Sequence, residues 1–296
     1  MSPVGPPAES RAQTTSAPGR RGRGRRRRPN LPAGVGATIW LLVVLVPLYW
    51  MVVTSLRDQA GFFEADPWLP PQHPTLDNYR LVLDSGFPQY LLNSLVVTTV
   101  SVLIIVTVSL LAAHAVVRGR GRFLRGTFSL LLLGLAIPLQ ATIIPVFLIV
   151  QKLGLYDSLW AVILPYVGFG IPVTFLILTN FLRDVPASLF EAMEMDGAGQ
   201  WTQLVRLVLP LSRGGIVAVC IYNALQVWNG FLFPLILTSK PEVKVLPLAL
   251  FDFQTNYAVN VPAVLAAVIL STLPLLALYV VGRRQLIAGL TAGAGK

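Results

Sequence analysis

Six long apolar runs, separated by shorter polar segments, dominate the pattern of residues along the chain. Crossing a hydrocarbon core of about 30 Å takes about 20 helical residues, and each run is long enough. None has an Asp, Glu, Lys or Arg at its centre, where one such residue would cost about 2.5–3.5 kcal/mol. Only helices and closed barrels satisfy the backbone in lipid, and the runs lack the alternation of barrel strands, so the pattern predicts an all-α polytopic membrane protein. The six predicted spans are 36–56, 90–117, 126–150, 159–181, 214–237 and 262–282.

The segment between the fourth and fifth runs, residues 182–213, is polar and has a different pattern. It predicts two short helices joined by a turn at Asp196 and Gly197, because glycine readily adopts the left-handed conformation that ends many helices. In the second helix, apolar residues recur at i, i+3, i+4 and i+7, which predicts one apolar stripe. The stripe consists of Trp201, Leu204, Val205 and Val208. Gln203 and Arg206 are expected to face away from it.

Composition supports a membrane protein, since 54% of the residues are hydrophobic and only 12% are charged, against about 25% charged in soluble domains. The net charge of +10 would also suit a nucleic-acid partner, but eight of the 19 arginines lie in the first 28 residues and most others flank apolar runs. That distribution is typical of membrane topology, so we expect no nucleic acid. Residues 1–33 lack a hydrophobic period and predict a disordered basic tail, which can contact anionic membrane lipid.

The basic residues also predict the orientation of the chain. With the N-terminus inside, 18 of the 23 Lys and Arg residues lie in cytoplasmic segments and five lie outside, as the preference for basic residues in cytoplasmic loops requires. The loop 182–213 and both termini are then cytoplasmic. The prediction divides the chain into the tail 1–33, a six-helix membrane domain over 34–284, and a cytoplasmic C-terminal tail over 285–296.

Two interpretations of the loop 182–213 are open on physical grounds. It is either a solvated hairpin that lies on the cytoplasmic face of the membrane, or a docking element. In the second case, its apolar stripe and fixed charges would fit a groove on a soluble partner. A docked hairpin would transmit rigid-body motion to the two helices that it joins.

The predicted fifth helix has a polar stripe, because Asn223, Gln226 and Asn229 recur every three residues with Trp228 beside them. At 3.6 residues per turn they spread over about 120°. One interpretation is interhelical hydrogen bonding, worth about 0.6–2 kcal/mol per bond. The other is a wall of a translocation path, where the amides would bind sugar hydroxyls and the indole would cover an apolar sugar face.

The loop sequence EAMEMDGAGQWTQLVRLVLPL (191–211) resembles the EAA loop of the membrane subunits of ABC importers. The matching positions are Glu191, Ala192, Asp196, Gly197, Ala198, Leu209, Pro210 and Leu211. Met193 and Gly214 depart from the pattern, which usually has alanine and proline there, and leave the docking geometry open. The segments that resemble carbohydrate-type, MalG-like permeases are LDNYRLVL (76–83), LLNSLVVTTVSVL (91–103), LAAHAVVRGRGR (111–122), VPASLFEAMEMDGA (185–198), WNGFLFPLIL (228–237) and GLTAGAGK (289–296).

The resemblance implies a MetI-like permease fold in a bacterial inner membrane, and a permease subunit of a binding-protein-dependent sugar importer. It implies four kinds of partner: a second, MalF-like permease subunit, a cytosolic ATPase dimer, an extracytoplasmic sugar-binding protein and the carbohydrate itself. The residues expected to couple the chain to the ATPase are Glu191, Ala192, Glu194, Asp196, Gly197, Ala198, Trp201, Leu204, Arg206 and Pro210. The expected residues of the substrate path are Asn223, Gln226, Trp228 and Asn229.

Other classes of function fit the sequence less well. A secondary solute transporter or channel subunit is the alternative, but cation coupling usually needs acids within the spans, and all 13 acids lie in loops or at interfaces. No G-x-S-x-G or H-E-x-x-H motif is present, and the single cysteine, Cys220, forms no thiolate cluster. The C-terminal GLTAGAGK lacks the first glycine and the Ser or Thr of a phosphate loop. We therefore expect no catalytic residue, metal or cofactor in this chain.

Overall fold

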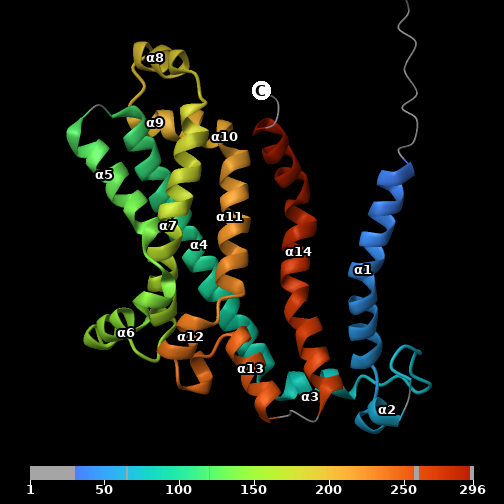
Figure 1. The fold of residues 1–296 in the computed structure, drawn as a ribbon. Helices are drawn as coiled ribbons and strands as arrows, with labels where there is room; N and C mark the ends of the chain where they lie inside the picture. The colour runs from blue at the N-terminus through green and yellow to red at the C-terminus, as the bar shows by residue number, and fades with distance from the viewer. Residues whose placement is uncertain (1–30, 65, 120, 257–259, 294–296) are drawn as a thin grey trace, which may run out of the picture. The chain divides into compact units, whose positions relative to one another are not determined.

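The computed structural model describes residues 31–64, 66–119, 121–256 and 260–293, and within these ranges the regular structure is helical. Residues 1–30 of the predicted tail 1–33 lie outside the described residues. Figure 1 shows the helices. In chain order they are α1 (Leu31–Ser55), α2 (Gln59–Glu64), α3 (Asp77–Asp84), α4 (Phe87–Arg118), α5 (Arg122–Leu133), η1 (Gly134–Ala136), η2 (Leu139–Thr142), α6 (Ile143–Lys152), α7 (Leu159–Arg183), α8 (Ala187–Met195), α9 (Gln200–Gln203), the π-helix η3 (Leu204–Val208), α10 (Leu209–Leu211), α11 (Arg213–Trp228), α12 (Leu232–Leu237), η4 (Pro241–Val243), α13 (Leu246–Asn256) and α14 (Val261–Gly293).

Four of the predicted spans are continuous helices that are long and apolar enough to cross a membrane. These stretches are Ala33–Ser55, Phe87–Arg118, Leu159–Arg183 and Val261–Val280. The part of the chain up to Val46 and the part from Pro47 form separate units, and the packing described below belongs to the second. Helix α14 continues to Gly293, beyond residue 284 where the C-terminal tail was expected to begin, and residues 294–296 lie outside the described residues.

The third predicted span, 126–150, is bent rather than straight. Its two halves, Gly126–Ala136 and Leu139–Lys152, meet at an angle of 95°. Pro138 explains the break, because proline has no backbone N–H for the helix and pushes the preceding residue into the extended region. Ile137 has φ −82° and ψ 113°, as that effect requires. The predicted span 126–150 is therefore bent in two, and it counts as one span if the two halves cross the membrane together.

The fifth predicted span, 214–237, is interrupted. Helix α11 has 16 residues, or about 24 Å at 1.5 Å per residue, and a separate helix, α12, begins at Leu232. Pro234 cannot donate a hydrogen bond to the carbonyl of Gly230. A Cβ atom on Gly230 would lie 1.8 Å from the Tyr166 hydroxyl, so glycine is needed where the chain passes this side chain. The predicted span 214–237 therefore consists of α11, a short break after Trp228, and α12.

Helices α4, α7 and α11 pack side by side, and one end of this group is covered by the short helices α8 to α10 (Figure 1). We call residues 187–211, which form α8 to α10, the hairpin. A single buried cluster joins the hairpin to the long helices. Its members are Val106, Leu110, Ala113, Phe175, Leu178, Leu182, Phe190, Leu204, Val208 and Val219. Burying each large apolar side chain contributes about 1.5–3 kcal/mol, so the base of the hairpin is part of the core.

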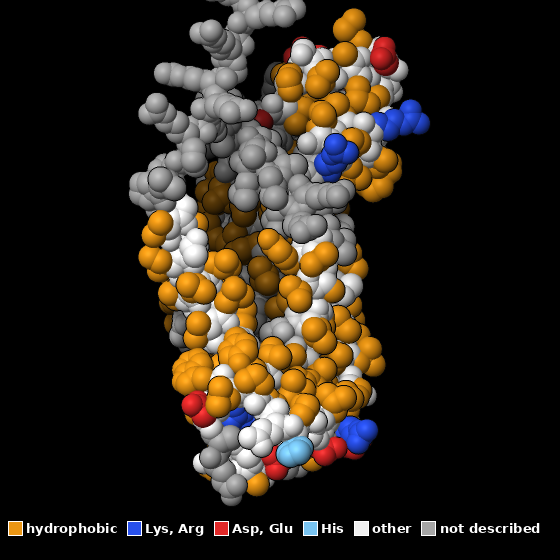
Figure 2. Space-filling model, turned by 90° about the vertical axis from the view of Figure 1, so that its right-hand side faces the viewer, with side chains coloured by type: hydrophobic (Ala, Val, Ile, Leu, Met, Phe, Trp, Pro, Cys, Tyr) orange, Lys and Arg blue, Asp and Glu red, His pale blue; other side chains and the backbone are white. Residues whose placement is uncertain are grey.

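The distribution of charge on the surface agrees with a membrane-spanning chain. On the face drawn in Figure 2, the Lys, Arg, Asp and Glu side chains gather at the two ends, and hydrophobic side chains cover the surface between them. A surface in contact with lipid tails needs this arrangement, because a charge at mid-membrane is costly.

Candidate functional site

The first helix of the hairpin, α8, ends at a glycine turn, as the sequence predicts. Gly197 has φ +78°, a left-handed conformation that costs other residues about 1–2 kcal/mol. Two backbone hydrogen bonds close the turn, from Ala198 N to Met193 O at 2.8 Å and from Gly197 N to Glu194 O at 3.0 Å. This pair of bonds is the Schellman motif, which satisfies the last carbonyls of a helix. The turn fixes the direction in which the second half of the hairpin leaves α8.

The inner face of α8 is held by Arg118, the last residue of α4. The Arg118 guanidinium forms an ion pair with the Glu194 carboxylate and lies over the ring of Phe190, 4.5 Å from its centroid. Phe190 is only 2% exposed. The position of a cation at the C-terminal end of α4 also suits the helix dipole. Glu194 is therefore engaged within the chain, although it was expected to belong to a surface that contacts another subunit.

The second half of the hairpin differs from the regular amphipathic helix that the sequence predicts. Residues 204–208 form a π-helix, whose wider turns shift the register of the side chains. Leu204 and Val208 are buried, whereas Trp201 is 71% exposed. The predicted stripe is thus divided between the core and the surface. Gln203, expected to face outward, is fully buried and donates a hydrogen bond from Nε2 to Glu194 Oε1 at 3.3 Å.

The outer surface of the hairpin combines acids with large apolar side chains. Met195 is 90% exposed and lies beside the turn, and Trp201 follows it on the second half. Of the residues expected to couple to an ATPase, Leu204 is buried and Ala198 is half-buried. The other exposed side chains of that set are Glu191, Ala192, Glu194, Asp196, Arg206 and Pro210. Exposed tryptophan and methionine side chains are typical of a binding surface.

The predicted polar stripe of the fifth helix does not face one common space. Asn223 is buried and donates from Nδ2 to Thr174 Oγ1 and to Val219 O, both at 2.8 Å, so it joins α11 to α7. Gln226 and Asn229 are exposed, and Asn229 donates to Leu225 O within its own helix at 2.8 Å. For Asn223 the structure agrees with interhelical hydrogen bonding rather than with a wall of the path.

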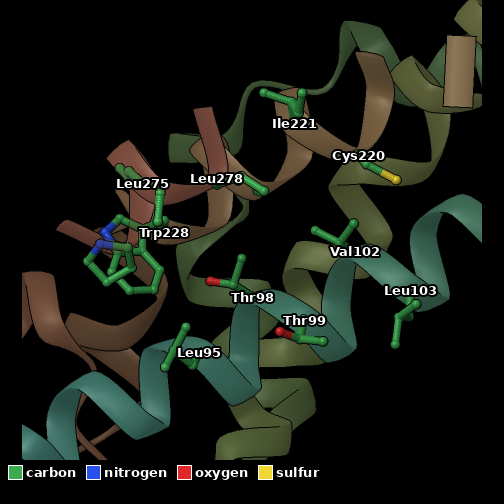
Figure 3. A pocket seen from close by; sticks show the side chains of 13 residues that line it. Leu95, Thr98, Thr99, Val102, Leu103, Cys220, Ile221, Trp228, Leu275 and Leu278 are labelled. Carbon is green, nitrogen blue, oxygen red and sulfur yellow. The ribbon is translucent and has the colours of Figure 1, made fainter. Parts of the chain in front are cut away.

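Trp228, the aromatic residue of the predicted path, is buried and lines a pocket of ≈ 490 Å³ between α4, α11 and α14. Figure 3 shows Thr98 and Thr99 of α4 on one side of it and Leu275 and Leu278 of α14 on another. Apart from the two threonines and the indole of Trp228, its described lining residues are apolar, so the pocket offers few hydrogen bonds to a sugar. In the described part of the chain, no three His, Cys, Asp or Glu side chains come together as a metal site.

The opposite end of α4 is tied to the segment after α12. Asn93 donates from Nδ2 to the carbonyl oxygens of Glu242 and Lys244, both at 2.8 Å. Ser94 Oγ accepts a hydrogen bond from Leu246 N at 2.7 Å. Asn93 and Ser94 are both buried, so these bonds fix the segment 242–246 against α4.

Asp157, in the loop before α7, is tied to the same region of the chain. Its carboxylate accepts hydrogen bonds from the backbone N–H groups of Ser239 and Lys240. These bonds stabilise the charged form and hold the pKa of Asp157 below its ordinary value of 3.8. In return, Asp157 N donates to Leu237 O at 3.1 Å. Arg118, which contacts the hairpin through Glu194 and Phe190, was not among the site residues that the sequence predicted, and neither was Phe190.

Comparison with known proteins yields one family and several relatives. The sequence model of a family described as "Binding-protein-dependent transport system inner membrane component" matches residues 105–286. The chain is similar to the trehalose/maltose transport system permease protein of Thermococcus litoralis, with 32% identity over 270 residues, 88% of this chain and 95% of that protein. It is also similar to a diacetylchitobiose uptake system permease protein of Streptomyces coelicolor, with 30% identity over 258 residues, 86% of this chain and 85% of that protein.

A solved structure shares the fold. The crystal structure of a bacterial ABC transporter involved in the import of the acidic polysaccharide alginate has a chain that aligns with a TM-score of 0.75. The alignment covers 86% of this chain and 95% of that one, at 22% sequence identity. The helix arrangement described above is therefore one that an importer uses.

Proposed function

Because this chain belongs to the family of inner membrane components of binding-protein-dependent transport systems, we propose that it forms part of the path by which an ATP-driven importer takes up a carbohydrate. The chain is a permease subunit, and ATP hydrolysis is the task of a separate ATPase. A carbohydrate is the best-supported substrate class, since the relatives include permeases named for trehalose/maltose and for diacetylchitobiose uptake.

The hairpin is the surface by which we expect the ATPase to drive the chain. The observation that supports this best is the contrast between its two faces. Its inner face is built into the core by Phe190, Leu204 and Val208, while Glu191 and Trp201 are exposed on its outside. A rigid, exposed element with a buried base moves the helices attached to it when a partner moves it. The hairpin connects α7 to α11, so both helices would move with the hairpin.

The substrate path is completed, in this proposal, by a second permease subunit. The pocket beside Trp228 is too apolar to hold a sugar by itself, and Asn223 is already used between helices. We assign to the path the exposed amides of Gln226, on α11, and of Asn229, directly after α11. The extracytoplasmic binding protein would deliver the sugar at the end opposite the hairpin, since the hairpin and both termini are cytoplasmic by the distribution of basic residues.

The ATPase contact is tested with the variant Glu191→Lys, in membranes that also contain the partner subunits. Glu191 is exposed on α8, so reversal of its charge changes the binding surface without disturbing the core. We expect the ATPase to stop co-purifying with the chain, and ATP hydrolysis stimulated by the sugar-loaded binding protein to fall, while membrane insertion is unchanged. Asp84→Lys, an exposed acid outside the hairpin, is the matched control and keeps the ATPase bound. Normal transport by Glu191→Lys would refute the contact.

Orientation is tested by labelling. With Cys220 replaced by alanine, a cysteine at the highly exposed Met195 position should react with a membrane-impermeant maleimide only in inverted vesicles. Labelling in intact cells would place the hairpin outside and overturn the proposal.

A further inference from the structure

The structure suggests how movement of the hairpin reaches α4. Helices α7 and α11 are joined to the hairpin by the backbone, but α4 is distant in sequence, and a force on α4 has to pass through side chains. We propose that Arg118 is the positioning residue that makes α4 follow the hairpin, and that α4 then moves the segment 242–246 at the opposite end. This inference rests on the proposed role of the hairpin as the surface driven by an ATPase.

The contacts of Arg118 bring both halves of the hairpin to α4 at one point. Glu194 of α8 forms the ion pair with Arg118 and accepts a hydrogen bond from Gln203 of α9. The Arg118 side chain is 18% exposed and the Glu194 side chain is 48% exposed, so the guanidinium is shielded from water while the carboxylate remains accessible to it. Phe190 lies under the guanidinium, which adds a second contact with a defined direction.

The apolar contacts around this point are less specific. The buried cluster beside the hairpin also includes residues of α4 such as Leu110 and Ala113. Apolar packing has no fixed direction, so it lets a helix slide or rotate at low cost. An ion pair combined with a stacked ring fixes one mutual position, because the guanidinium is planar and donates in a fixed geometry. Arg118 is therefore the contact that best resists sliding between the hairpin and α4.

The far end of α4 is fixed as firmly. Asn93 and Ser94 hold the segment 242–246 by three hydrogen bonds of 2.7–2.8 Å. From residue 93 to residue 118 a helix rises about 38 Å at 1.5 Å per residue, which exceeds the hydrocarbon thickness of about 30 Å. Between its two fixed ends α4 contributes Thr98 and Val102 to the pocket beside Trp228. A displacement of α4 thus changes the pocket and the segment 242–246 together.

The test removes the charge of Arg118 and follows the far half of α4. In a background without Cys220, a single cysteine replaces Leu95, an exposed residue of α4 at the pocket. Its maleimide labelling rate is measured in the assembled transporter with and without ATP. We expect ATP to change that rate in the parent protein and not in Arg118→Gln, with transport reduced about tenfold, within the usual range of coupling between distant sites.

Controls separate this inference from the proposed function and from misfolding. Arg183→Gln alters the basic residue at the end of α7, which lies over the Phe128 ring of α5, and should leave the ATP-dependent change in labelling intact. The exchange of charges in Arg118→Glu combined with Glu194→Arg should restore part of the transport that either single change removes. If the parent protein responds to ATP and Arg118→Gln responds equally, the inference is refuted while the proposed function stands. If the parent protein binds no ATPase, the proposed function fails first.

Discussion

Replacement of Gly197 by alanine tests whether the hairpin must keep one shape. Gly197 has φ +78°, and no atom lies within 4 Å of the position that a Cβ would occupy. The substitution therefore introduces backbone strain without a steric clash. The left-handed conformation costs a non-glycine residue about 1–2 kcal/mol, which corresponds to a factor of about 5–30 in a two-state population. Valine should cost more, because a β-branched residue is a genuine outlier at positive φ.

The expected result is loss of coupling rather than loss of the protein. When the turn opens, the bonds from Ala198 N to Met193 O and from Gly197 N to Glu194 O are lost, and the hairpin samples other directions. Hydrogen exchange at these two amide groups should accelerate by about 5–30-fold. ATP hydrolysis stimulated by the loaded binding protein should fall in the reconstituted complex, while insertion into the membrane is unchanged.

Gly199→Ala is the matched control, two residues along the same loop. Gly199 has φ −74° and also has nothing within 4 Å of its Cβ position, so alanine fits there without strain. If Gly197→Ala and Gly199→Ala behave alike in both assays, backbone strain at the turn is irrelevant to coupling and the reasoning is refuted.

Two further predictions concern the other polar contacts. Asn223→Ala removes the hydrogen bond between α11 and α7 and should destabilise the protein in detergent by about 1–3 kcal/mol, because it leaves buried partners unsatisfied. Gln226→Ala changes an exposed side chain and should alter transport while leaving stability unchanged. A thermal shift measurement distinguishes the two variants, and equal shifts would contradict the placement of these side chains. Asp157 has a lowered pKa, so it contributes stability above its ordinary value of 3.8 and loses that contribution as the pH falls through the lowered pKa. The stability difference between the wild type and Asp157→Asn should be present at pH 7 and vanish in acid, and a difference that grows in acid would contradict the assignment.

The local turn chemistry of the hairpin could be predicted because it depends on neighbouring residues. An Asp-Gly pair after an amphipathic segment indicates a left-handed helix end whatever surrounds it, and Gly197 has that conformation. The burial of the Gln203 side chain could not be predicted from neighbouring residues. A regular helix places it outside, but the π-helix that follows and the carboxylate of Glu194 bring it into the core.

The sequence by itself determined that the chain is helical and membrane-spanning, where its apolar spans lie, and which segment forms the polar hairpin. These properties follow from the hydrocarbon thickness and the cost of charges in lipid, which act on each segment separately. Only the tertiary structure decided that Arg118 forms an ion pair with Glu194, that Asn223 donates a hydrogen bond to Thr174, and that the fifth span breaks where Gly230 lies against Tyr166. These pairs are 76, 49 and 64 residues apart in the sequence, and a pattern of nearest neighbours contains no information about which distant side chains pack together.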